Sequence, residues 1–211
     1  MHENLKGEVL NVSKTMLERG MVIGSSGNVS VRKGDHVVVT PSSVPYSEME
    51  QEDIIVIDLE GEVVDGHLPP STETATHLEI YKNRDDAKAI VHSHSVYATA
   101  LATIRKPLPV ISDEIAPYLG GEIRVSEYAM AGTTYLAKNV VKALEGRSAV
   151  LLASHGALCI GKTLKEAFSN AVLLERACQV YSIALGAGEP HLLPPDVVEE
   201  EAEIWNEAHT E

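Results

Sequence analysis

The sequence is poor in cysteine, in basic residues and in long apolar runs, and each shortage excludes a class of protein. Its only two cysteines, Cys159 and Cys178, lie in apolar stretches. Buried free thiols are the usual state there, so we expect no disulfide. No apolar run reaches the roughly 20 residues of a membrane-spanning helix, and the first residues lack the basic-then-apolar pattern of a signal peptide. Together these features predict a cytoplasmic protein.

Basic residues are outnumbered by acidic ones. The chain has 17 Lys and Arg against 31 Asp and Glu, which gives a formal net charge of −14. Such a balance disfavours nucleic acid and anionic membranes as partners. It leaves room for a phosphorylated small molecule, because backbone amides and hydroxyl groups can hold a phosphate locally.

What remains is the composition of a folded globular protein. The hydrophobic fraction is 44% of 211 residues, and we find no repeat, low-complexity tract or long linker. This length suits one domain with a sizeable core. We therefore predict a single domain over residues 1–211, with its core at about 5–187 and an acidic C-terminal tail at 188–211.

Two hairpins are expected in the first third of the chain, after an N-terminal helix. Apolar residues recur at helical spacing from Leu5 to Met16, and Gly20 follows as a stop. The segment "VSVRKGDHVVVTP" reads as a hairpin that turns at residues 33–35. The segment "DIIVIDLEGEVVDG" reads as another, turning at 60–61.

Helices and strands alternate in the rest of the chain. Further helices are expected at 74–83, 97–104, 133–144, 163 to about 185, and, as a short one, within 194–208. Strands are expected to end at 92–94 and to flank a turn at 155–156. Thr163 and Glu166 have the spacing of a capping box. The order predicts an α/β fold with a central, mainly antiparallel sheet and helices on its faces.

The segment "GALCIGKT", residues 156–163, matches the spacing of a phosphate-binding P-loop. Its intervening residues are apolar and suit a buried strand. No apolar strand ending in Asp follows to help hold magnesium. We interpret the segment as a strand and turn that lead into a capped helix.

Three histidines and one glutamate have the pattern of a metal site. His92 and His94 lie one residue apart at the end of an apolar strand, so both side chains point to one side. His155 lies where another strand meets a glycine turn, and Glu73 directly precedes a helix. Imidazole and carboxylate groups together bind divalent metals such as zinc.

Each of these residues also has a simpler interpretation. A histidine pair can lie on a strand surface, and a glutamate in a first helical turn is commonly solvated. Three other histidines compete as ligands, and we interpret each of them as a surface residue: His36, His67 and His77.

Three turns are rich in small polar residues. They are "GSSGNVS" at 24–30, "TPSS" at 40–43 and "PSTE" at 70–73. Such turns expose backbone N–H groups and hydroxyls, which suits a phosphate monoester without a large basic patch. Each one alone also fits an ordinary hairpin or helix-cap turn.

The motifs "GNVSVR", "TPSS-x-PY", "PSTE", "HSH" and "SHG" occur in this order within residues 5–187. In this the chain resembles the class II aldolase and adducin-head family, and specifically its L-fuculose-1-phosphate aldolase-like members. The resemblance implies an α/β fold with a central antiparallel sheet. It also implies a C4 homotetramer with active sites at subunit interfaces, and Zn²⁺ (or Mn²⁺ or Co²⁺) held by His92, His94 and His155.

The same resemblance assigns the catalytic carboxylate to Glu73, which also serves as a metal ligand. The aldolases of the family carry Glu at this position, whereas the epimerases typically carry Asp. The substrate phosphate would be bound by Gly27, Asn28, Ser42, Ser43, Ser71 and Thr72. The pair Ser42-Ser43 departs from the Thr-Gly of the fuculose enzymes.

A second departure concerns the proton donor. The fuculose enzymes supply a tyrosine from a neighbouring subunit, at a position that Asp113 occupies here. Tyr118 lies five residues further on. Both residues are candidates for the second proton donor, and the departure leaves the aldehyde half of the substrate open.

The implied reaction is metal-dependent cleavage of a (deoxy)ketose 1-phosphate to dihydroxyacetone phosphate and a small aldehyde. The metal would stabilise the enediolate as a Lewis acid while Glu73 shuttles the proton, so no Schiff-base lysine is needed. The same scaffold also supports L-ribulose-5-phosphate 4-epimerases, sugar-acid phosphate decarboxylases and a methylthioribulose-phosphate dehydratase. The adducin head, a non-catalytic binding module, is disfavoured because the four candidate ligands are present.

Overall fold

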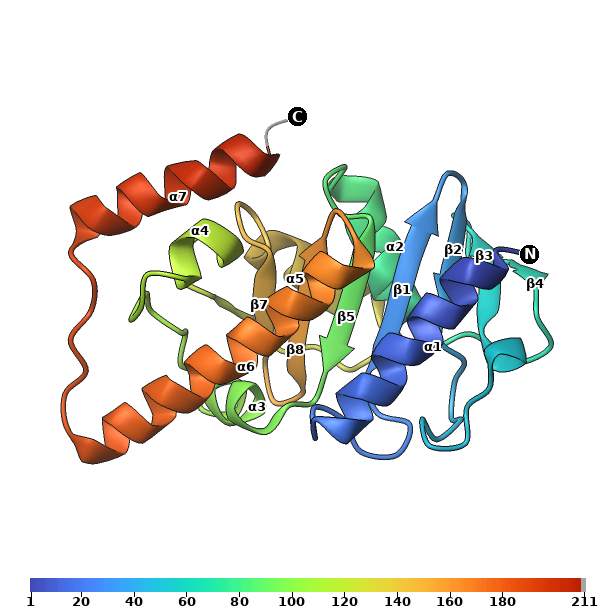
Figure 1. Cartoon of the computed structure of the whole chain (residues 1–211), viewed down its shortest axis with the longest axis horizontal. Helices are drawn as coiled ribbons and strands as arrows, with labels where there is room; N and C mark the ends of the chain where they lie inside the picture. The colour runs from blue at the N-terminus through green and yellow to red at the C-terminus, as the bar shows by residue number, and fades with distance from the viewer. Residues whose placement is uncertain (210–211) are drawn as a thin grey trace.

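One eight-stranded sheet separates two layers of helices in the computed structural model, which describes residues 1–209 (Figure 1). The strands lie in the order β4-β3-β2-β1-β5-β8-β7-β6. Every neighbouring pair is antiparallel except β6 and β7, which are parallel. The strands are β1 Asn28–Lys33, β2 His36–Val39, β3 Ile55–Asp58, β4 Val63–Asp65, β5 Ala89–Ser93, β6 Val125–Ser126, β7 Ala149–Leu152 and β8 Gly156–Gly161. The predicted α/β fold with a mainly antiparallel sheet is therefore confirmed.

Helices cover both faces of this sheet. In Figure 1, α1 and α6 cross the face nearer the viewer, and α2 and α5 lie behind. The helices are α1 Glu3–Glu18, α2 Thr74–Asn83, α3 Val96–Thr103, α4 Ile115–Leu119, α5 Thr134–Ala143, α6 Leu164–Ala187 and α7 Pro195–His209, with a 3-10 turn at Gln51–Asp53.

The alternation of strand side chains builds two apolar cores. Val29 and Val91 pack into the cluster shared with α1, α3, α4 and α6. Ile90 and Ile160, on the opposite face, pack with residues of α2 and α5. Because the central strands are buried on both faces, they read as nearly continuous apolar runs.

Strand register gathers the candidate site at one end of the sheet. Asn28 begins β1 and pairs with His92, near the end of β5. His92 pairs in turn with Leu158 of β8, and Ser93 pairs with Ala157. The predicted turn at 155–156 lies at the same end of the sheet, so segments that are far apart in the sequence meet there.

Most predicted elements form close to their predicted bounds, including the helix at 74–83 and both early hairpins. The short helix α4 and the two-residue strand β6 were not predicted. The capping box is half correct, because Glu166 N–H donates to Thr163 Oγ1 at 3.2 Å but the Glu166 carboxylate accepts from Lys162 N–H at 3.0 Å.

The P-loop-like segment is a strand. Residues Gly156–Gly161 form β8, whose backbone is paired with β5 and β7, and Thr163 caps α6. Backbone amides engaged in a ladder are not free to cradle a phosphate, which agrees with the interpretation from the sequence.

The C-terminal residues fold back on the body of the chain. Trp205 of α7 is buried, and its indole Nε1–H donates to Ser148 Oγ at 2.7 Å. The division into a core at 5–187 and a tail at 188–211 stays a prediction, and its last two residues lie outside the described range. Cys159 and Cys178 are free and buried, as expected. In the described range we find no helix with the length and apolarity that crossing a membrane requires.

Candidate metal and phosphate site

Three histidine side chains converge at the end of the central strands. The candidate ligand atoms of His92, His94 and His155 all lie within 4.8 Å of one another. His92 Nε2 is 3.0 Å from His94 Nε2. His92 lies within β5, which ends at Ser93, and His94 is the first residue after the strand. The turn between β7 and β8 supplies His155, so the predicted three-histidine cluster is present.

The backbone sets the tautomer of the central histidine. His92 Nδ1 is 2.9 Å from the carbonyl oxygen of Ala157. Because a carbonyl can only accept, Nδ1 must carry the hydrogen. In the neutral ring, Nε2 then presents its lone pair to the cluster, as in metal-binding histidines.

Glu73 adds a carboxylate to this cluster. It is the residue before the first turn of α2, and its Oε2 lies 3.0 Å from His92 Nε2. Its Oε1 lies 3.4 Å from His155 Nε2. Three imidazoles and one oxygen donor are a set that borderline divalent metals prefer, so the residues fit the metal that the family pattern implies.

Mutual electrostatics shift the pKa values of these groups. Burial alone would raise the pKa of Glu73, but the charges of His92 and His155 and the Asn28 hydrogen bond hold it well below its usual range. Burial opposes the charged form of His92, yet Glu73 and the Ala157 carbonyl raise its pKa. Burial and the neighbouring histidines lower the pKa of His94 to about 4. Glu73 is therefore a carboxylate and His94 a neutral ring at pH 7.

Asn28 holds the carboxylate from the side of the sheet. Its Nδ2 donates to Glu73 Oε2 at 2.9 Å and to Ser71 Oγ at 3.1 Å. Ser71 Oγ also accepts from the backbone N–H of Glu73 at 3.3 Å. The first strand and the turn before α2 are thus joined at the carboxylate.

Two glycines permit the close approach of these segments. Gly27 has φ +75°, and a Cβ on it would lie 2.6 Å from the His92 carbonyl oxygen. A Cβ on Gly156 would overlap the Ser93 carbonyl and crowd the rings of His92 and His94. Any larger residue at either position would displace the histidine strand.

A polar hollow of about 270 Å³ opens beside the cluster. Its lining includes Glu73, His94 and His155 together with all six predicted phosphate-binding residues, namely Gly27, Asn28, Ser42, Ser43, Ser71 and Thr72. The prediction had not singled out four more lining residues, Ser25, Ser26, Pro41 and Ala131. The serines lie in the quoted Gly-Ser-Asn turn and could have been found, but nothing in the sequence marks Ala131.

The other candidate residues lie elsewhere. His67 is exposed, and His36 Nδ1 lies 3.1 Å from His2 Nε2. The expectation that His77 is a surface residue is wrong, because its side chain is buried between α2 and strand β1. Asp113 and Tyr118 do not line the hollow of their own chain. Their part in proton transfer stays a prediction.

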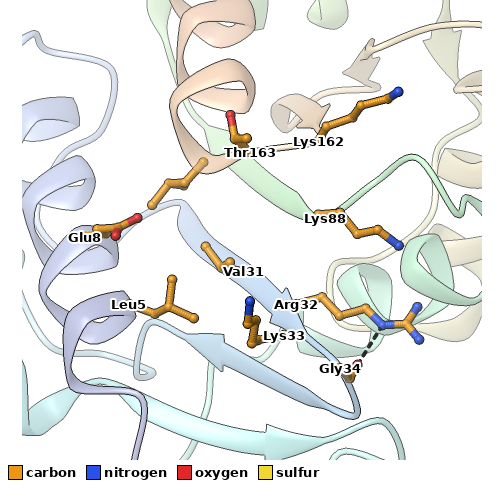
Figure 2. A pocket seen from close by; sticks show the side chains of 10 residues that line it. Leu5, Glu8, Val31, Arg32, Lys33, Gly34, Lys88, Lys162 and Thr163 are labelled. Carbon is orange, nitrogen blue, oxygen red and sulfur yellow. Dashed lines mark hydrogen bonds between the residues drawn. The ribbon is translucent and has the colours of Figure 1, made fainter. Parts of the chain in front are cut away.

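A larger hollow, of about 520 Å³, lies at the opposite end of the same strands (Figure 2). Arg32, Lys88 and Lys162 contribute to its lining. Both lysines are exposed, and in Figure 2 their side chains extend in different directions. Its lining holds no histidine or other metal-type cluster, so size alone does not identify the site.

Known proteins are similar to this chain in sequence and in fold. The class II aldolase and adducin N-terminal domain family matches residues 7–182. The 5-methylthioribulose-1-phosphate/5-deoxyribulose-1-phosphate aldolase of Rhodospirillum rubrum is 37% identical over 92% of this chain and 88% of its own. The 5-deoxy-D-ribulose 1-phosphate aldolase of Bacillus thuringiensis is 37% identical over 91% of each chain. A solved L-fuculose 1-phosphate aldolase has a TM-score of 0.93 and 40% identity, over 98% of each chain.

Proposed function

Because this chain belongs to the class II aldolase and adducin N-terminal domain family, we propose that it is a metal-dependent sugar-phosphate aldolase. The observation that carries the proposal is the contact of Glu73 with His92 and His155 at the mouth of a polar hollow. An acid-base carboxylate, a metal site and a polar cavity with hydroxyl and backbone donors for a phosphate are the three parts that this reaction requires.

His92, His94 and His155 would hold the metal, with Glu73 as a further ligand before substrate binds. Zn²⁺ is the ion that we propose, since three imidazoles suit it; Mn²⁺ or Co²⁺ would serve in its place. Once bound, the cation supplies Lewis-acid stabilisation of the negative charge that develops when the carbon–carbon bond breaks.

Glu73 would move the proton at the reacting carbon. Because its pKa is held low, it rests as a carboxylate and can accept a proton from dihydroxyacetone phosphate in the condensation direction. In cleavage the steps run in reverse: Glu73 first takes up a proton from solvent and then delivers it to that carbon, while the hydroxyl that becomes the aldehyde gives its proton to the second acid-base group. Asn28 keeps the carboxylate oriented by its 2.9 Å hydrogen bond.

The three polar turns would bind the phosphate and so set which carbon faces Glu73. Ser42, Ser43, Ser71 and Thr72 supply hydroxyls around the hollow, and the Gly27–Asn28 turn approaches it from β1. Neutral donors can hold a phosphate in a chain whose net charge is −14. Fixed geometry of this kind converts binding into rate.

The substrate that we propose is a (deoxy)ketose 1-phosphate, which yields dihydroxyacetone phosphate and a small aldehyde. The names of the R. rubrum and B. thuringiensis relatives support a 5-deoxypentulose phosphate, and the solved fuculose enzyme supports a 6-deoxyhexulose phosphate. Asp113, in place of the family's tyrosine, is consistent with a change in the aldehyde half. Asp113 or Tyr118 of a neighbouring subunit would complete proton transfer.

We also propose a homotetramer with interfacial active sites. Three strongly exposed apolar residues adjoin the site in sequence: Ile23 near the first polar turn, Val96 just after His94, and Met130 beside Ala131. A second copy would cover them and supply Asp113 or Tyr118. The buried free thiols are consistent with the cytoplasmic location that we propose.

Product analysis tests this function. Purified protein would be incubated with the 1-phosphates of fuculose, rhamnulose, 5-deoxyribulose and methylthioribulose, and with L-ribulose 5-phosphate. The proposal expects dihydroxyacetone phosphate from at least one ketose 1-phosphate. Conversion of L-ribulose 5-phosphate to its 4-epimer, with no triose phosphate from any substrate, would instead favour the epimerase alternative.

A further inference from the structure

A buried chain of polar side chains joins α2 to β1 directly beneath the site. Ser30 Oγ lies 2.7 Å from His77 Nδ1 and 2.7 Å from Tyr81 Oη. All three side chains are at most 1% exposed. Ser30 lies on the sheet face whose neighbouring residues, such as its cross-strand partner Ile90, form an apolar core. Polar groups in such a place are costly unless they are paired, so their geometry is strongly constrained.

These contacts lie in register with the catalytic carboxylate. His77 and Tyr81 lie four residues apart on one stripe of α2, and Glu73, the residue that precedes the helix, lies four residues before His77. Asn28 and Ser30 are two residues apart on one face of β1. Four helical residues rise about 6 Å and two strand residues about 6.6 Å, so the contacts Asn28–Glu73 and Ser30–His77 form successive rungs.

A third rung closes the ladder at its far end. Arg32, two residues beyond Ser30, donates from Nη1 to the carbonyl oxygen of Tyr81 at 2.8 Å. The helix is thus tied to one strand at three levels. Ser30 occupies the middle level, where one hydroxyl group bridges two side chains a helical turn apart.

We propose that Ser30, His77 and Tyr81 form a positioning unit that fixes the height and rotation of α2 on the sheet, and thereby places Glu73 against Asn28 and the histidine cluster. His77 is the central member of this unit and a positioning residue. It does not bind substrate, because it does not line the polar hollow. The inference rests on the catalytic role proposed above for Glu73.

Only one edge of the His77 ring carries the link. Nδ1 faces Ser30, whereas Nε2 is buried and has no hydrogen-bond partner among the described residues. Replacing the imidazole of His77 with either of two amide side chains distinguishes the role of Nδ1 from that of Nε2. Asparagine places a polar atom near the position of Nδ1, and glutamine places one near Nε2. His77→Asn should keep the link to Ser30, and His77→Gln should break it.

Steady-state kinetics of the metal-loaded enzyme test the unit. We expect His77→Gln and Ser30→Ala to lower kcat by about ten-fold to a hundred-fold, since small misplacement of an acid-base group has effects of this size. KM should stay within about three-fold, because the phosphate turns are unchanged. His77→Asn should recover most of kcat. Ile80→Val, a change in the apolar core on the same helix, controls for general loss of stability and should leave kcat unchanged.

The outcomes separate this inference from the proposed function. If wild type releases triose phosphate and Glu73→Gln does not, the function stands. Normal kcat in both His77→Gln and Ser30→Ala would then overturn the positioning unit. Equal loss of kcat in His77→Asn and His77→Gln would overturn it too, because the Ser30 edge of the ring would not matter. If the wild-type protein cleaves no ketose phosphate, the proposed aldolase function is wrong, and the positioning unit that rests on it falls with it. Ser30→Ala covers the case in which a His77 variant does not fold.

Discussion

The imidazole Nδ1 of His92 donates to the carbonyl oxygen of Ala157 at 2.9 Å, across the antiparallel pair β5–β8. Strand β8, which follows the turn that holds His155, therefore orients the ring of His92 on the neighbouring strand β5. A backbone carbonyl is a common outer partner of metal-binding histidines, and it leaves Nε2 directed at the cluster. The pairing of β5 with β8 thus sets the orientation of this candidate metal ligand.

Removal of one imidazole should abolish tight metal binding. His94→Ala deletes one of three convergent nitrogens, and we expect metal affinity to fall by more than the roughly hundred-fold that loss of an outer partner causes. Metal content after gel filtration and chelator competition would measure this loss. His36→Ala is the matched control, because His36 lies outside the cluster. Equal metal content in wild type and His94→Ala would contradict the site.

A second carboxylate beside Glu73 should shift the pH profile. Asn28→Asp replaces the Nδ2 donor, 2.9 Å from Glu73 Oε2, with a negative charge. The hydrogen bond from Asn28 helps to keep the pKa of Glu73 low. Loss of this bond raises the pKa, and the negative charge of the new aspartate raises it further. We expect the acid limb of kcat/KM to move to higher pH, while Asn28→Ala lowers the rate with a smaller shift. An unchanged acid limb in Asn28→Asp would argue against Glu73 as the proton-transfer group.

Burial of His77 should make its contribution to stability depend on pH. Burial lowers its pKa to about 3, whereas the unfolded chain has about 6.5. Between these values the unfolded state binds more protons, so stability from this group is present above pH 6.5 and is lost as pH falls. The slope is about 1.4 kcal/mol per pH unit.

Urea unfolding of metal-stripped wild type and His77→Asn checks this expectation. The difference in unfolding free energy between the two proteins should be largest at pH 8 and should narrow below pH 6.5. A difference that stays constant from pH 8 to pH 4 would show that His77 titrates alike in the folded and unfolded chains.

Substitution of Gly27 should damage both stability and the site. Gly27→Ala introduces a strained backbone conformation and a contact of 2.6 Å with the His92 carbonyl oxygen. Gly20→Ala is a close control, since Gly20 has a similar φ of +69° but open space around its Cβ position. We expect Gly20→Ala to cost about 1 kcal/mol and Gly27→Ala clearly more. Thermal unfolding and metal titration would check both effects, and equal results for the two variants would show that the His92 contact is unimportant.

Local sequence patterns predicted most of the fold and the grouping of three histidines with Glu73, whereas the individual phosphate-binding residues and the catalytic role of Glu73 followed from the family resemblance. Period-two alternation and turn residues located the hairpins, and the spacing of His92 and His94 predicted that their rings would meet. The position of His77 was not predictable in this way. Its burial depends on which helix covers the polar face of β1, and a single histidine on α2 carries no sign of Ser30, 47 residues earlier in the chain. The same limit applies to α4, whose five residues are too few for a periodic pattern.

The most direct test of the account is the release of dihydroxyacetone phosphate by metal-stripped and metal-restored protein. A coupled dehydrogenase would follow the triose phosphate released from 5-deoxyribulose 1-phosphate and fuculose 1-phosphate. We expect no release without metal, recovery of release on addition of one equivalent of Zn²⁺, and no recovery in His94→Ala. Full activity after complete removal of the metal would contradict the central claim.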